Sequence, residues 1–119
     1  MAVAANLAAN LTGIRDRMDR AALRSGREPS CVRLIAVTKT FPVSACAEAL
    51  EAGIEDLGEN YPKELRDKAP AYPQATWHFL GPLQTGTVRY VADRADWVHT
   101  LAPGASMGGL GARASRSGR

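Results

Sequence analysis

The chain has 119 residues, a length that suits one small domain with a modest core. Its apolar fraction of 45% and charged fraction of 23% are ordinary for a globular protein, and no stretch approaches the roughly 18–20 apolar residues of a membrane span. The net charge of +3 comes from Arg113, Arg116 and Arg119, so residues 1–101 balance 12 basic against 12 acidic residues, which argues against nucleic-acid binding.

The first segment has the pattern of an amphipathic helix. Apolar residues recur at helical spacing, with Arg and Asp between them: Val3, Leu7, Leu11, Ile14 and Met18. Ser25 and Gly26 can end this helix, and we expect its apolar face to pack on a core. The start of the chain lacks the basic residues and dense apolar block of a signal peptide, which predicts a cytoplasmic protein.

Strand and helix patterns then alternate along the chain. The predicted strands are 32–37, 55–57, 76–79 and 97–101, and the predicted helices between them are 45–51, 61–69 and 87–94. Strand starts lie about 21–23 residues apart, the length that a strand, a helix and two short loops require. The sequence therefore predicts an α/β fold with a parallel sheet. An N-terminal helix with four such units matches the N-terminal half of a (β/α)₈ TIM barrel, and a small doubly wound sheet is the alternative.

The last segment differs in composition from the rest. Fifteen of the 18 residues in 102–119 are Gly, Ala, Ser or Arg, without hydrophobic periodicity. Such a segment has too little apolar surface to offset the entropy of ordering. We therefore predict a domain over 1–101 and a disordered tail over 102–119.

Polar residues follow the predicted strands at the edge where a parallel sheet binds its ligands. Lys39 comes directly after the first strand, and we expect it partly withdrawn from water at the mouth of the sheet, where a neutral amine can attack an aldehyde. A solvated lysine just past a strand is the plainer interpretation. Asn60 follows the second strand, where it could hydrogen-bond a ligand or form a turn.

The residues that most often bind metals do not form a pattern here. Cys31 and Cys46 fit no metal or redox spacing, so we expect free thiols. His78 and His99 lie inside strand patterns, where a histidine within the core is the simpler interpretation. The sequence therefore predicts no metal site.

Three segments together resemble a known family. They read Leu-Ile-Ala-Val-Thr-Lys-Thr-Phe-Pro over 34–42, Gly-Glu-Asn-Tyr over 58–61 and Trp-His-Phe-Leu-Gly-Pro-Leu-Gln over 77–84. In order and separation they are similar to the pyridoxal phosphate homeostasis proteins, also called the alanine-racemase-N-terminal-like family. The resemblance covers about residues 7–101, and it is the combination of segments that makes it specific.

The resemblance implies a TIM barrel in which Lys39 forms a Schiff base with pyridoxal 5′-phosphate and Asn60 lies close to that cofactor. It also implies a protein that binds and hands over pyridoxal phosphate within the cell and affects amino-acid and keto-acid balance. Family members lack an established catalytic turnover, so no catalytic residue is predicted. Protein partners are not predicted, and a role with nucleic acid or membranes is not expected.

Two alternatives remain at this point. A pyridoxal-phosphate-dependent amino-acid racemase would carry Ala-Tyr-Gly after its lysine and a second, β-rich domain, whereas Thr40, Phe41 and Pro42 follow Lys39 here. The family pattern also stops after Leu101, before the late strands whose loops hold the cofactor phosphate in the family. The second alternative is therefore a truncated or frameshifted, non-functional fragment.

Overall fold

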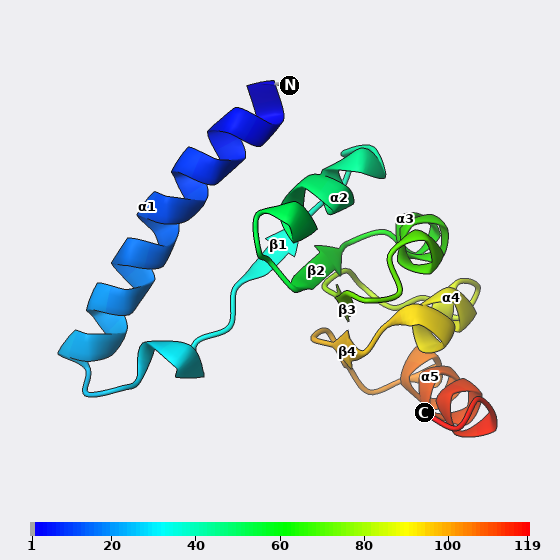
Figure 1. Cartoon of the computed structure of the whole chain (residues 1–119). Helices are drawn as coiled ribbons and strands as arrows, with labels where there is room; N and C mark the ends of the chain where they lie inside the picture. Colours follow the sequence, from blue (N-terminus) through cyan, green and yellow to red (C-terminus); the bar gives the residue numbers. More distant parts are fainter. Residues whose placement is uncertain (1) are drawn as a thin grey trace.

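The computed structural model describes residues 2–119, over which the chain alternates between helices and short strands (Figure 1). The α-helices of this part are α1 (Ala2–Arg24), α2 (Ser44–Glu51), α3 (Pro62–Lys68), α4 (Val88–Arg94) and α5 (Ala105–Arg116), and the 3-10 turns are η1 (Pro29–Cys31) and η2 (Ala69–Ala71). The strands are β1 (Ile35–Val37), β2 (Asp56–Glu59), β3 (Thr76–Phe79) and β4 (Trp97–Val98).

The four strands form one sheet in the order β1-β2-β3-β4, with every neighbouring pair parallel. In the register, Val37 pairs with Gly58, Gly58 with His78, and Phe79 with Val98. The predicted α/β fold with a parallel sheet is confirmed. A doubly wound sheet reverses its strand order at a switch point, and the described strands show no such reversal. All four carboxyl ends therefore share one edge of the sheet.

The two faces of the sheet have different surroundings. Side chains of Leu57, Trp77 and Phe79 point into the apolar core, where Leu65 of α3 and Val91 of α4 cover them. Figure 1 shows α2, α3, α4 and α5 following one another beside the strands in chain order. On the opposite face, a side chain at Gly58 would contact Ile35, Val37 and Leu80, and Val37 remains 43% exposed.

Local sequence explains where α2 and α3 end and begin. Gly53 has a φ of +89°, a left-handed conformation that glycine adopts without steric cost, and its N–H bonds the Leu50 carbonyl at the end of α2. Pro62 stands in the first turn of α3, where its missing N–H leaves no helical bond unmade. The end of α2 at Gly53 returns the chain to the amino end of β2. Pro62 then begins α3 shortly after the carboxyl end of β2.

Helix α1 lies against the rest of the chain through few residues. Leu11 is buried and joins the apolar core, and the Arg15 guanidinium donates to the Gly53 carbonyl at 3.4 Å. Ile14, which belongs to the same apolar stripe, is 44% exposed. The stripe expected to pack on a core is thus covered only in part.

Residues 102–119 were predicted to be disordered, and the structure corrects this prediction. Helix α5 packs against α4, and the Arg113 guanidinium makes two 2.8 Å hydrogen bonds to the Asp93 carboxylate. A side chain at Gly109 would meet Val88 Cγ1 at 3.3 Å, and Leu110 packs against the core. The small residues that suggested disorder are what allow this close approach between the helices.

Among residues 2–119, no helix is long and apolar enough to cross a membrane. The same residues contain no group of three or more histidine, cysteine or acidic side chains that could hold a metal ion. Cys46 is buried and Cys31 is exposed, both as free thiols.

Candidate functional site

Lys39 and Asn60 lie at the carboxyl edge of the sheet, Lys39 two residues after β1 and Asn60 directly after the neighbouring strand β2. The ladder continues to this edge, because the Thr38 N–H donates to the Gly58 carbonyl at 3.0 Å. Asn60 is half-buried. Lys39 is exposed rather than partly withdrawn from water, and no hydrogen bond or ion pair joins its ammonium to the part of the chain described. Lys39 therefore lies at the predicted edge of the sheet, but its side chain is not shielded from water as we expected.

The loops after β2, β3 and β4 are packed tightly at this edge. A Cβ atom added to Gly81 would lie 1.9 Å from the Asn60 carbonyl oxygen, so glycine is required for the observed contact. The Thr100 hydroxyl donates to the Gly81 carbonyl at 2.5 Å. The structure thereby brings together Asn60, Gly81 and Thr100, which follow three successive strands.

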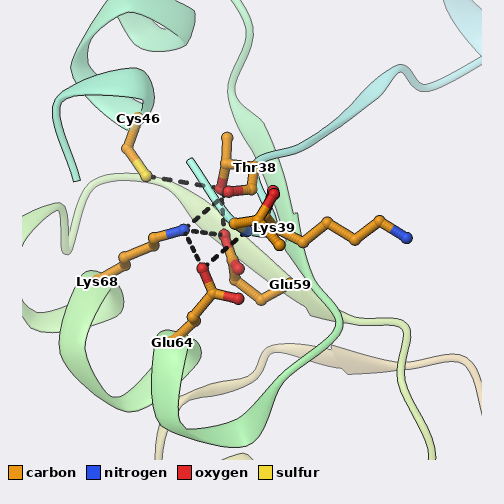
Figure 2. A network of polar contacts seen from close by, with 7 residues as sticks. Thr38, Lys39, Cys46, Glu59, Glu64 and Lys68 are labelled. Atoms are coloured by element: carbon orange, nitrogen blue, oxygen red, sulfur yellow. Dashed lines mark hydrogen bonds and ion pairs between the residues drawn. The ribbon is translucent and has the colours of Figure 1, made fainter. Parts of the chain in front are cut away.

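A buried polar network lies beneath Lys39, between the sheet and helices α2 and α3 (Figure 2). The Lys68 ammonium, from the last turn of α3, is bonded to the Thr38 carbonyl at 2.8 Å, to Glu64 Oε1 at 3.0 Å and to Glu59 Oε2 at 3.2 Å. The Thr38 hydroxyl donates to Glu59 Oε2 and lies 3.7 Å from Cys46 Sγ. We call Thr38, Glu59, Glu64 and Lys68 the Lys68 network.

Burial and the neighbouring charges set the titration of this network. Burial raises the pKa of Glu59 above its ordinary value, against the hydrogen bonds that it receives from Thr38 and Lys68. Burial lowers the pKa of Lys68, but its hydrogen bonds to Glu64 and Glu59 outweigh this and leave that pKa raised. Burial also raises the pKa of the Cys46 thiol, which therefore stays protonated at neutral pH.

A second polar chain lies on the other face of the sheet. His78 Nε2 is 2.8 Å from the Asp56 carboxylate, and His78 Nδ1 is 2.9 Å from His99 Nε2. His78 is buried with both ring nitrogens in contact, as expected of a histidine within a core, whereas His99 is exposed. This arrangement ties β2, β3 and the segment after β4 together.

Sequence reasoning missed the Lys68 network. Glu59, from the Gly-Glu-Asn-Tyr segment, is fully buried and paired with Lys68, a partner that the sequence did not single out. Glu64 and Lys68 stand four residues apart on α3, a spacing that places them on one helix face. That spacing was a usable signal, but it does not reveal that Lys68 reaches the main-chain carbonyl of Thr38, just after β1.

The fold and the site together define an α/β protein whose reactive side chains lie at the carboxyl edge of a parallel sheet. No family model matches the chain. It is 45% identical over 101 residues to the pyridoxal phosphate homeostasis protein of Escherichia coli, an alignment covering 81% of this chain and 43% of that protein. It is also 45% identical over 98 residues to the protein of that name in Vibrio cholerae, covering 77% of this chain and 42% of the relative.

Solved structures agree with these relatives. PipY of Synechococcus elongatus, determined with pyridoxal phosphate bound, is 38% identical and matches with a TM-score of 0.69 over 89% of this chain and 50% of PipY. A protein of unknown function from Bifidobacterium adolescentis is 25% identical, with a TM-score of 0.79 over 98% of this chain and 51% of its own. The chain spans less than half the length of the curated relatives named above. Over the part that it spans, the curated proteins that it resembles are pyridoxal phosphate homeostasis proteins.

Proposed function

We propose that this chain binds pyridoxal phosphate through Lys39 and takes part in pyridoxal phosphate homeostasis, as a cofactor-binding protein and not as a catalyst. The observation that carries the proposal is the position of Lys39, a lysine with a free ammonium at the carboxyl edge of a parallel sheet. The family name and the pyridoxal phosphate bound in PipY support the choice of ligand.

We further propose that the four strands form the first half of a (β/α)₈ barrel, with α1 preceding it. Support comes from the strand order, which advances in one direction, and from the helices, which cover one face of the sheet. The other face, with Ile35 and Val37, then corresponds to the barrel interior. The similarity to half of the length of PipY agrees with this assignment.

The residues at the edge suit this ligand. Pyridoxal phosphate supplies an aldehyde that condenses with an uncharged lysine amine, releasing one water molecule. In this chain Lys39 offers such an amine at the carboxyl edge of the sheet, exposed and joined to no described residue by an ion pair. The Asn60 side chain, on the adjacent strand, provides an amide that can hydrogen-bond a ring oxygen.

A labelling experiment tests the proposal directly. The sequence contains three lysines, Lys39, Lys63 and Lys68, so borohydride reduction in the presence of pyridoxal phosphate, followed by peptide mapping, resolves every side-chain site. We expect the label on Lys39, its loss in Lys39→Arg, and no change in Lys63→Arg, the matched exposed control. Equal labelling of Lys39 and Lys63 would refute selective binding.

The racemase alternative is tested on the same preparation. With pyridoxal phosphate and L-alanine present, we expect no formation of D-alanine above the level produced by free pyridoxal phosphate. Formation of D-alanine that depends on Lys39 would replace the proposed binding role by a catalytic one.

A further inference from the structure

The Lys68 ammonium is nearly inaccessible to solvent, with only 3% of the residue exposed, and its three donors have three acceptors. Two of these are the Glu59 and Glu64 carboxylates, and the third is the main-chain carbonyl of Thr38, the residue before Lys39. An ordinary ion pair on α3 would not need a contact with the main chain that follows β1. The carbonyl contact is therefore the feature that needs an explanation.

The network also holds the residue after Lys39. The Thr40 N–H donates to Glu64 Oε1 at 2.9 Å, and the same oxygen accepts from Lys68. Thr40 has a φ of +66°, a left-handed conformation that is costly for a β-branched residue and that its surroundings must maintain. The Lys68 and Glu64 side chains of α3 thus hold the main chain on both sides of Lys39.

The Lys39 side chain itself takes no part in these contacts. Figure 2 shows it leading away from Lys68 and Glu64, so that the network holds the backbone while the amine stays free. The Phe41 N–H adds a turn by donating to the Thr38 carbonyl at 3.1 Å. With the flanking residues 38 and 40 fixed, the direction in which Lys39 leaves the sheet is fixed as well.

We propose that Lys68 and Glu64 are positioning residues, which hold the main chain around Lys39 so that its amine meets the ligand aldehyde in one orientation. This proposal rests on the proposed function of Lys39. It assigns to α3 a role in ligand capture that acts through the main chain around Lys39. Without the network, Lys39 keeps its amine but can leave the sheet in several directions, which slows condensation and disorders the product.

Two variants test this role. Lys68→Met keeps a long side chain at the buried position but removes every donor, and Glu64→Ala removes the acceptor for the Thr40 N–H. Lys63→Met, at an exposed position of the same helix, is the matched control. For each protein we would measure the condensation rate with pyridoxal phosphate, the circular dichroism induced in the cofactor absorption band, and thermal unfolding.

We expect Lys68→Met and Glu64→Ala to lower the condensation rate about tenfold, or roughly 1.4 kcal/mol in activation free energy, and to weaken the induced dichroism, while Lys39 remains the labelled residue. Lys63→Met should match the parent protein. Lys68→Arg, which retains donors, should recover part of the induced signal. If Lys68→Met fails to unfold cooperatively, the Glu64→Ala variant tests the positioning role instead. We expect Glu64→Ala to fold, because Glu64 is part-exposed and Lys68 keeps Glu59 as a partner.

The outcomes separate the two proposals. Absence of Lys39 labelling in the parent protein would refute the proposed function. Labelling in the parent protein, together with unchanged rates and unchanged induced dichroism in folded Lys68→Met or Glu64→Ala, would overturn the positioning role alone. Faster hydrogen exchange of the Thr40 amide in Glu64→Ala would support it independently of the ligand.

Discussion

Gly81 lies against the main chain of Asn60, and its missing side chain makes this contact possible. The proposed site depends on that contact, because it fixes the chain where Asn60 leaves β2. Gly86, a few residues further along the same loop, has no atom within 4 Å of the position of an added Cβ. The two glycines therefore differ in what an added methyl group would meet, although both lie in the loop between β3 and α4.

We predict that Gly81→Ala destabilises the chain by about 3 kcal/mol, at the upper end for overpacking, because the new methyl group would lie 1.9 Å from a backbone oxygen. Gly86→Ala, the matched control, should change the free energy of unfolding by less than about 0.5 kcal/mol. Denaturant unfolding of both variants provides the comparison. Equal stabilities would show that the Asn60 segment can move aside without cost.

At the scale of the elements, sequence patterns predicted those strands and helices whose first and last residues are set by neighbours in the sequence. The strand predicted at 76–79 is observed as β3, with alternating core residues and a following glycine. The strand predicted at 32–37 begins only at Ile35, because η1 occupies Pro29–Cys31 and pairing depends on where β2 begins. Such pairing limits involve a partner about twenty residues away, which periodicity within one segment cannot reveal.

Helix α5 was missed for a related reason. Glycines within a helix each cost roughly 0.5–1 kcal/mol, so the three in α5 make the isolated segment a poor helix. Its order depends on α4, through the close approach at Gly109 and the two bonds from Arg113 to Asp93. In the same way, the Lys68 network depends on contacts of α3 with Thr38 and Glu59, and only the four-residue spacing of Glu64 and Lys68 is visible in the sequence.

We predict that Arg113→Ala loosens α5 while the sheet stays intact. Hydrogen exchange at the α5 amides should become at least tenfold faster, whereas Arg116→Ala, at an exposed position on the same helix, should have little effect. Retained protection of α5 in Arg113→Ala would show that apolar packing alone holds the helix on α4.

The same contact predicts a pH dependence. The hydrogen bonds from Arg113 hold the pKa of Asp93 below its ordinary value of 3.8. A lowered carboxyl pKa contributes stability that is present above the ordinary value and is lost as pH falls through the lowered pKa. Protection of α5 in the parent protein should therefore decrease below about pH 3.8 and should change less in Arg113→Ala.

At the scale of the whole chain, the sheet has one covered face and one open face. The strand order leaves β1 and β4 at the edges of the described sheet, where unpaired main-chain groups can pair with another chain. Val37, Phe41 and Trp97 lie at or beside these edges with 43%, 51% and 54% of their surfaces exposed. Exposed apolar groups next to open strand edges favour association between copies of the chain.

We therefore predict that the chain self-associates with increasing concentration, and that Val37→Lys weakens this association at least tenfold, by roughly 1.4 kcal/mol. A lysine at this position places a charge beside the open edge of β1, a substitution that opposes edge-to-edge pairing. Leu23→Lys is the matched control, since Leu23 is an apolar residue of α1 with 66% of its surface exposed, away from the sheet. Sedimentation velocity over a hundredfold range of concentration measures both effects. A parent protein that stays monomeric over this range, or a control that dissociates as readily as Val37→Lys, would show that the open edges do not drive association.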